Sequence, residues 1–234
     1  MEPDEYIRMD EAEARMWWYR ALHTRLLDAL ANCRDPILDA GCGTGGFLQL
    51  IDPSREAFGL EWNAAAAAMA AAKSGRPIAR GSVNELPFAA DSFGTVIAAD
   101  VLCHAAVNPA AALAEIRRVL RPAGRLIVNM PAYRSLMSAH DVQVHNARRM
   151  NAEETRAMLE DSGFRVRRVR YWNSLLLPLM ILQRKILARS SDRSDVAVFP
   201  PWLNAILHGM TEFERSLRLS LPAGGSVLAI AERP

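Results

Sequence analysis

The sequence has few cysteines, no long apolar run and no strong charge of either sign. Its three cysteines, Cys33, Cys42 and Cys103, are odd in number and lack C-x-x-C spacing, which argues against a disulfide framework or a zinc site and predicts a reducing, cytoplasmic setting. The net charge of +2 argues against a nucleic-acid partner. No stretch reaches the roughly 18 apolar residues of a membrane span, and the acidic N-terminal segment does not resemble a signal peptide.

The overall composition is typical of a soluble α/β domain. Hydrophobic residues make up 50% and charged residues 23% of the 234 positions, enough for a sizeable core. Apolar segments predict strands near residues 36–40, 56–61, 77–80, 94–99 and 125–130. Helices are expected over 11–32, 63–73 and 108–122, the last beginning at Pro109 and ending at Pro122. Such alternation predicts a mostly parallel sheet that binds ligands at the carboxyl ends of its strands.

The segment ILDAGCGTGGFLQL, from Ile37 to Leu50, joins an apolar strand to a glycine-rich turn and the start of a helix. Gly41, Gly43 and Gly46 fit the pattern G-x-G-x-x-G, in which the backbone approaches a ligand closely. Glu61 follows about twenty residues later, at the end of a second apolar run, where a carboxylate can accept hydrogen bonds from a ribose. By itself this pattern fits NAD, FAD or another adenosine ligand.

Asp39 distinguishes between these possible ligands, because it lies two positions before the first glycine. A carboxylate there would repel the two negative charges of a dinucleotide pyrophosphate. S-adenosylmethionine has no phosphate, and its sulfonium and ammonium groups are both cationic. Asp39 therefore favours S-adenosylmethionine over NAD.

The run DAGCGTG resembles the first motif of the class I S-adenosylmethionine-dependent methyltransferases, of the small-molecule, methyltransferase-11-like type. FGLEWN and GSVNELPFAADSFGTVIAADVLCH, which ends at His104, resemble the motifs that follow. The resemblance covers roughly residues 36–131 and departs from the family at Ser82 and Gly94, where Asp is usual. It implies a Rossmann-like sheet of seven strands whose antiparallel last strand inserts between the fifth and sixth. It also implies S-adenosyl-L-methionine as cofactor and S-adenosyl-L-homocysteine as product.

The resemblance further implies which residues bind the cofactor. Glu61 would hold the ribose, Ser82 and Val83 the adenine, and Tyr19 or Trp18 would cover the methionyl group, whose carboxylate pairs with Arg20. The alternative for the N-terminal aromatic residues is plain core packing. The full expected set is Tyr19, Arg20, Asp39, Gly41, Cys42, Gly43, Gly45, Glu61, Trp62, Ser82, Val83 and Asp100.

Three histidines are candidate bases, since a hydroxyl or carboxylic acid acceptor must lose its proton near neutral pH. They are His104, at the end of the fourth-strand motif, and His140 and His145, in the loop after the fifth strand. That loop resembles a subgroup of the family, and its Arg148 and Arg149 would be available for an anionic substrate. The alternative for each histidine is loop hydrogen bonding or helix capping.

Residues 1–234 are expected to form a single domain. It comprises an N-terminal cap helix (1–35), a core (36–172), a helical insertion (173–224) and a final strand (225–234). RVRRVRYW, from Arg165 to Trp172, alternates like a half-buried edge strand rather than a nucleic-acid site. The insertion predicts two helices that cap a substrate pocket, with a homodimer seam and membrane or lipid contact through residues 175–182 and the basic residues after them as alternatives.

These features predict methyl transfer to an oxygen or carbon of a small molecule, in the biosynthesis of a metabolite. Ser82 and Gly94 leave open a protein that binds S-adenosylmethionine without methylating, either cyclase-like or an interaction module. The glycine spacing and Glu61 leave open a nicotinamide-dependent oxidoreductase, although the sequence has no Tyr-x-x-x-Lys pair. Fold and cofactor do not identify the acceptor.

Overall fold

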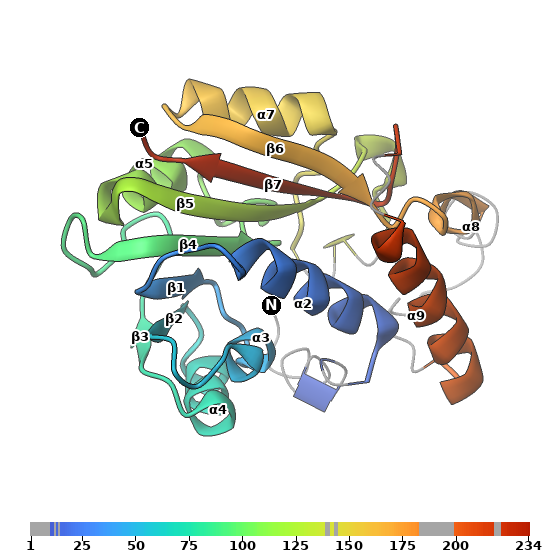
Figure 1. Ribbon diagram of the computed structural model, residues 1–234, viewed down its shortest axis with the longest axis horizontal. Helices are drawn as coiled ribbons and strands as arrows, with labels where there is room; N and C mark the ends of the chain where they lie inside the picture. Colours follow the sequence, from blue (N-terminus) through green and yellow to red (C-terminus); the bar gives the residue numbers. More distant parts are fainter. Residues whose placement is uncertain are drawn as a thin grey trace.

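The computed structural model describes residues 10, 11, 13, 15–138, 141–142, 145–182, 199–217 and 221–234. Its centre is a seven-stranded sheet in the order β3-β2-β1-β4-β5-β7-β6 (Figure 1). The strands are β1 (Ile37–Ala40), β2 (Ala57–Glu61), β3 (Ile78–Arg80), β4 (Phe93–Ala99), β5 (Leu120–Pro131), β6 (Arg165–Trp172) and β7 (Ser226–Glu232).

The first five strands are parallel, and the last is antiparallel to both of its neighbours. β1 pairs with β2 on one side and with β4 on the other, so the strand order reverses direction between β1 and β4. β7 lies between β5 and β6, with Ile127 opposite Ile230. The predicted insertion of the last strand and the predicted edge position of β6 are confirmed. The reversal point is where open α/β sheets bind ligands.

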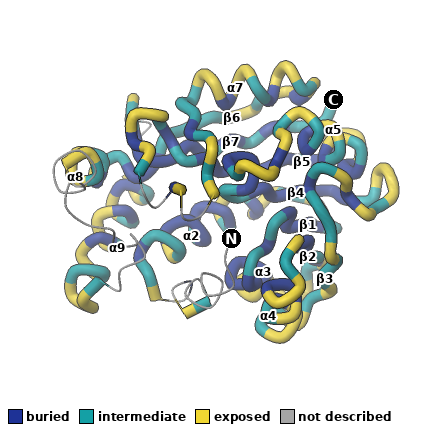
Figure 2. The backbone as a smooth tube through the Cα atoms, turned by 180° about the vertical axis from the view of Figure 1, so that it is seen from behind, coloured by how far each residue is buried: buried dark blue, intermediate teal, exposed yellow. Residues whose placement is uncertain are grey.

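Helices cover both faces of the sheet. α2 (Trp17–Leu30), α3 (Gly46–Leu50) and α4 (Ala64–Ser74) cover one face, and α5 (Pro109–Val119) and α7 (Ala152–Asp161) the other. Strand residues alternate between the two: Ile37 packs under α2, whereas Leu38 packs with α5. Figure 2 shows this as buried backbone along the central strands and exposed residues along the outer sides of α4 and α7.

Two predicted helix boundaries differ from the structure. The N-terminal helix, expected over 11–32, is the 14-residue α2, which starts at Trp17, where the backbone N–H donates to Asn204 Oδ1 at 2.7 Å. The helix expected to end at Pro122 ends three residues earlier, at Val119. Leu120 pairs with Phe93 of β4 and so belongs to β5. Sheet pairing, which local sequence does not show, decides this boundary.

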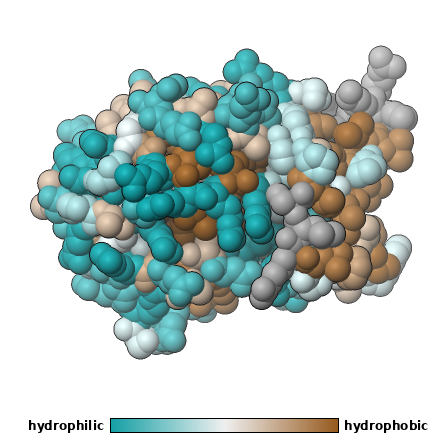
Figure 3. All heavy atoms as spheres, turned by 45° about the horizontal axis from the view of Figure 1, so that its top comes forward, coloured by the Kyte–Doolittle hydropathy of each residue, from teal (hydrophilic) through white to brown (hydrophobic). Residues whose placement is uncertain are grey.

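The segment before β7 contains α8 (Leu177–Leu182) and α9 (Pro201–Ser216), and a short 3₁₀ helix, η1 (Arg134–Leu136), follows β5. α9 packs beside α2, where Arg25 donates to the Thr211 carbonyl at 2.7 Å. Hydrophobic side chains gather at this end of the molecule (Figure 3). The exposed ones are Leu175, Leu179, Ile181, Leu182, Trp202, Ile206, Met210, Phe213 and Leu217. Within the described ranges, no helix has the length and apolar character to cross a membrane.

Candidate active site

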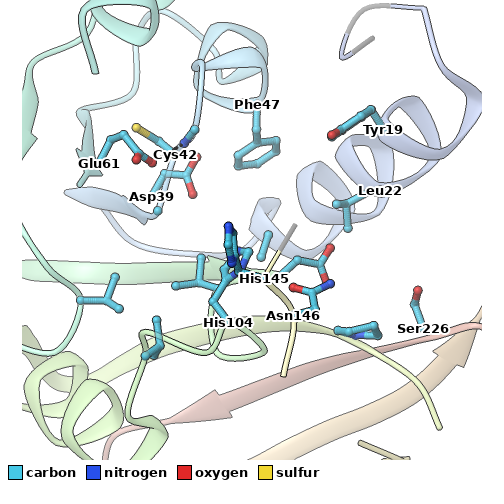
Figure 4. A pocket seen from close by; sticks show the side chains of 18 of the residues that line it. Tyr19, Leu22, Asp39, Cys42, Phe47, Glu61, His104, His145, Asn146 and Ser226 are labelled. Atoms are coloured by element: carbon cyan, nitrogen blue, oxygen red, sulfur yellow. Dashed lines mark hydrogen bonds between the residues drawn. The ribbon is translucent and has the colours of Figure 1, made fainter. Parts of the chain in front are cut away.

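One large cavity, of about 1050 Å³, opens at the carboxyl ends of the parallel strands. The turn after β1, the ends of β2 and β4 and the start of β7 contribute to it, and α2 forms a wall. In Figure 4, Asp39 and Glu61 lie on one side and Tyr19 and Leu22 of α2 on the other. We refer to the side with Asp39 and Glu61 as the glycine-turn half of the cavity, and to the side with Tyr19 and Leu22 as the α2 half.

The glycine turn brings bare backbone to the cavity wall. Gly41 has a φ of +97°, and a Cβ there would collide with the side chain of Val101. Gly43 has a φ of +55°, and its N–H donates to Glu61 Oε2 at 3.1 Å. Both conformations favour glycine. The turn therefore offers a surface without side chains, held in place by the carboxylate at the end of β2.

Glu61 is 7% exposed and lines the cavity. Its Oε1 accepts the Asn63 N–H at 2.9 Å while Oε2 accepts that of Gly43, so both carboxylate oxygens are fixed. A carboxylate oxygen accepts more than one hydrogen bond, which leaves capacity for the hydroxyl groups of a sugar.

A second and a third carboxylate make this half acidic, although Lys73 offsets the charge of one of them. Asp39 is 3% exposed, and burial, Glu13 and Glu61 raise its pKa to about 7. Glu13, which sequence reasoning missed, accepts from Thr44 Oγ1 at 2.7 Å and from Lys73 Nζ at 2.8 Å. Glu13 lies 31 residues before Thr44 in the sequence, and no local pattern indicates that the two side chains meet. Such a cluster attracts a cationic ligand and repels an anionic one.

Ser82, Val83 and Trp62 lie at the rim beyond Glu61, and all three line the cavity. The Ser82 hydroxyl accepts the Asn84 N–H at 3.1 Å, and Val83 is buried against the core. Trp62 is 72% exposed. Together they contribute one hydroxyl and two largely apolar side chains to the cavity wall.

Other expected cofactor residues lie at different distances from the cavity. Tyr19 lines the α2 half and Cys42 lines the glycine turn, where burial raises the pKa of its thiol. Arg20 is exposed and is not among the described lining residues, because it points from α2 toward solvent. Gly45 lies behind the turn against Ala70 of α4 and does not line the cavity either.

Asp100, directly after β4, lies in a fixed hydrogen-bond network. Its carboxylate oxygens accept from Asn129 Nδ2 at 3.0 and 3.1 Å, and Trp172 Nε1 donates to Asn129 Oδ1 at 2.8 Å. Burial is the main cause that raises the pKa of Asp100 to about 7, against the hydrogen bond from Asn129. The indole thus sets the orientation of the amide, and the amide that of the carboxylate.

His104 and His145 line the centre of the cavity, between the two halves (Figure 4). Their segments are joined by the Ala105 N–H, which donates to the His145 carbonyl at 2.8 Å, and by a bridge between His104 and Asn146. His140, the third candidate, lies outside the described residues. The structure therefore brings two of the three candidate bases to one place.

The arginines expected to meet an anionic substrate bind groups of the protein instead. Arg149 is buried, and its Nε and Nη2 donate to Asp141 at 3.0 Å each while Nη1 donates to the Ala132 carbonyl at 3.2 Å. Arg148 donates to the carbonyl of His104 at 2.6 Å. This differs from the prediction because the buried Asp141 carboxylate requires a positive partner and backbone carbonyls accept the remaining donors.

Residues 38–128, from β1 into β5, match the family model of a methyltransferase domain. This match covers the part of the chain from which the glycine turn and Glu61 line the cavity. An uncharacterised protein of Mycobacterium tuberculosis is 32% identical over 145 residues, which are 56% of this chain and 47% of that protein. The chain thus spans about half the length of the curated relatives it matches.

Two solved structures share the fold of this chain. A geranyl diphosphate methyltransferase in complex with S-adenosylmethionine is 20% identical, with a TM-score of 0.63 over 92% of this chain and 85% of that one. The [4+2]-cyclase SpnF is 21% identical, with a TM-score of 0.60 over 93% and 83%. At these identities the likeness shows the fold, and the two names show that this fold serves different reactions.

Proposed function

We propose that this chain transfers a methyl group from S-adenosylmethionine to an oxygen or carbon atom of a small molecule, in the biosynthesis of a metabolite. The observation that carries the proposal is the acidic cluster of Glu13, Asp39 and Glu61 around a glycine turn that exposes bare backbone. The sulfonium and ammonium groups of S-adenosylmethionine fit this charge, and the pyrophosphate of a nicotinamide cofactor does not.

The cofactor would lie over β1 and β2, at the reversal point of the sheet. Glu61 would accept from the ribose hydroxyls, and Asp39 would face the ammonium group of the amino-acid end. Ser82 and Val83 would meet the adenine. These assignments are supported by the position of all four residues on the cavity wall. The sulfonium would then face the centre of the cavity, toward His104 and His145.

Methyl transfer from a sulfonium is a displacement in line with the breaking carbon–sulfur bond, so the protein contributes mainly proximity, alignment and exclusion of water. His104 and His145 are in position to orient the acceptor or take its proton. Met180 of α8 and Phe199, next to α9, reach the cavity wall. This supports the cap role of the segment before β7 over a homodimer seam or a membrane contact.

A second candidate is a protein that binds S-adenosylmethionine without transferring its methyl group. The fold shared with a cyclase is the observation that favours it. The two candidates differ in a single readout, which is the appearance of a product heavier by one methyl group.

Calorimetry tests the cofactor directly. The purified chain is titrated with S-adenosylmethionine and, separately, with NADH, and we expect micromolar binding of the first and no heat from the second. Heat with NADH alone would remove the methyltransferase proposal. Incubation with a metabolite extract and S-adenosylmethionine, followed by mass spectrometry for methyl-shifted products, separates the methylating from the non-methylating candidate.

A further inference from the structure

The α2 half of the cavity has apolar walls. Trp17 and Leu22 come from α2, and Met180 and Phe199 from the segments before β7. Trp17 and Phe199 belong to one hydrophobic cluster with Leu176 and Leu207, so this wall joins α2 to α9. A ligand in this half exchanges water for hydrocarbon and aromatic surface, which favours an apolar body.

Among the described residues, no Lys or Arg side chain that lines the cavity is available to bind an anionic ligand. Arg149 is the one Lys or Arg among them that lines the cavity, and its guanidinium is occupied by Asp141 and the Ala132 carbonyl. The carboxylates of the lining are Glu13, Asp39, Glu61, Glu85, Asp100 and Asp141. A phosphate or carboxylate on the ligand would therefore meet repulsion without a partner.

The polar groups on this side that can take up a ligand are two acceptors, described next, and one donor, the buried Trp17 Nε1, which has no acceptor among the described residues. Asp100 is held by Asn129, and a carboxylate can accept up to about four hydrogen bonds, so it has capacity for one more donor. Asn173 lines the cavity, is fully buried, and its Oδ1 accepts no hydrogen bond among the described residues. Acceptors in the wall require donors on the ligand, and a neutral hydroxyl is a donor.

We infer that the methyl acceptor is an uncharged, largely apolar molecule with a hydroxyl group, whose body lies between α2 and Phe199 and whose hydroxyl donates to Asp100. The inference rests on the proposed function and specifies the chemical class of its methyl acceptor. In the reaction the hydroxyl oxygen bonds to the methyl carbon as the carbon–sulfur bond breaks, and the hydroxyl proton passes to the Asp100 carboxylate. The products are a methyl ether and the neutral thioether S-adenosylhomocysteine.

The charge around Asp100 agrees with this role. Burial, and to a smaller extent Asp141, raise its pKa, while Asn129 on β5 and Arg149 lower it, with a result of about 7. A group with a pKa near the working pH exchanges a proton in either direction at little cost. Asn129 and Trp172 are positioning residues here, and Trp172 in turn stacks on Trp18 of α2 with ring centroids 6.2 Å apart.

The test uses the full chain saturated with S-adenosylhomocysteine and matched pairs of probes, measured by calorimetry. The pairs are farnesol with farnesyl phosphate and 1-naphthol with 1-naphthyl phosphate. We expect at least one alcohol to bind more tightly than its phosphate ester by about tenfold or more, which is about 1.4 kcal/mol. Farnesylamine is measured beside farnesol as a cationic comparison. The inference is overturned if both phosphates bind at least as tightly as their alcohols, if none of the four probes binds, or if farnesylamine binds more tightly than farnesol.

Asp100→Asn tests the residue, with Asp161→Asn at the exposed end of α7 as the matched control. We expect Asp100→Asn to weaken binding of the alcohol about tenfold relative to the parent, with both chains saturated with S-adenosylhomocysteine. Unchanged alcohol binding in this variant overturns the role of Asp100. If S-adenosylhomocysteine does not bind the parent chain, the proposed function fails; if it binds and the alcohols do not, only this inference fails.

Discussion

The two halves of the cavity are built in different ways. The glycine-turn half comes from neighbouring segments, in which Gly43 donates to Glu61, only 18 residues away. The α2 half joins residues far apart in the chain: Trp172 donates to Asn129, 43 residues away, and Asn204 meets Trp17 across 187 residues. One half is thus a local structure that many relatives can share, and the other is specific to how this chain folds back on itself.

The largest effect is expected at the glycine turn. Gly43→Val places a branched side chain on a backbone with a φ of +55°, where the cofactor must approach. We expect affinity for S-adenosylmethionine to fall by about a hundredfold or more, measured by calorimetry. Gly209→Val on the exposed side of α9, where a Cβ meets nothing within 4 Å, is the control and should bind normally. Normal binding by Gly43→Val would place the cofactor elsewhere.

Glu61→Gln should have the next largest effect. The substitution keeps the size of the side chain but removes the charge that accepts from Gly43 and Asn63. Hydrogen bonds to a charged group contribute about 1.5–3 kcal/mol, so we expect a loss of cofactor affinity of about tenfold to a hundredfold. Glu56→Gln, at the exposed start of β2, serves as control. Equal affinities in the two variants would contradict the assigned role of Glu61.

Asp39→Asn should weaken cofactor binding while it raises the free energy of unfolding. A carboxyl group whose pKa rises to about 7 on folding holds its proton longer in the folded state, so it costs stability as pH rises from about 4 to 7. At pH 8 without cofactor, we expect the variant to be more stable than the parent by about 1–3 kcal/mol in urea unfolding. Its affinity for S-adenosylmethionine should fall. A variant less stable at pH 8 would mean that Asp39 is not strained by burial.

His23, on α2, should give a pH effect of opposite sign. Burial and then Lys73 lower its pKa to about 4, so its contribution is present above about pH 6.5 and is lost as pH falls toward 4. In His23→Phe, the stability difference between pH 7 and pH 5 should shift by about 1–2 kcal/mol toward greater stability at pH 5. Unfolding curves at the two pH values measure this shift. An unchanged pH dependence would contradict a buried neutral imidazole.

The sequence allows the glycine-turn half to be predicted because strand, turn and carboxylate follow one another within a single β-α-β unit. The residues predicted for this half all line the cavity: Asp39, Gly41, Gly43 and Glu61. Glu13 could not be predicted, because its contact with Thr44 depends on how the N-terminal segment returns to the turn.

The α2 half could be predicted only in part, because its contacts join distant segments. The positions of Arg148 and Arg149 in sequence indicate available charge, yet their partners, the His104 carbonyl and Asp141, are set by the path of the loop. The end of α5 is likewise set by pairing of Leu120 with β4. Local patterns show which side chains are present, and long-range contacts decide which of them remain available to a ligand.

A crystal structure of the chain with S-adenosylhomocysteine is the most direct test of the cofactor site. We predict that the ribose hydroxyls lie within hydrogen-bond distance of the Glu61 carboxylate, and that the sulfur atom faces the side of the cavity that holds Asp100 and His104. A nucleoside bound away from the Gly41–Gly43 turn, or a sulfur atom that faces solvent, would contradict it.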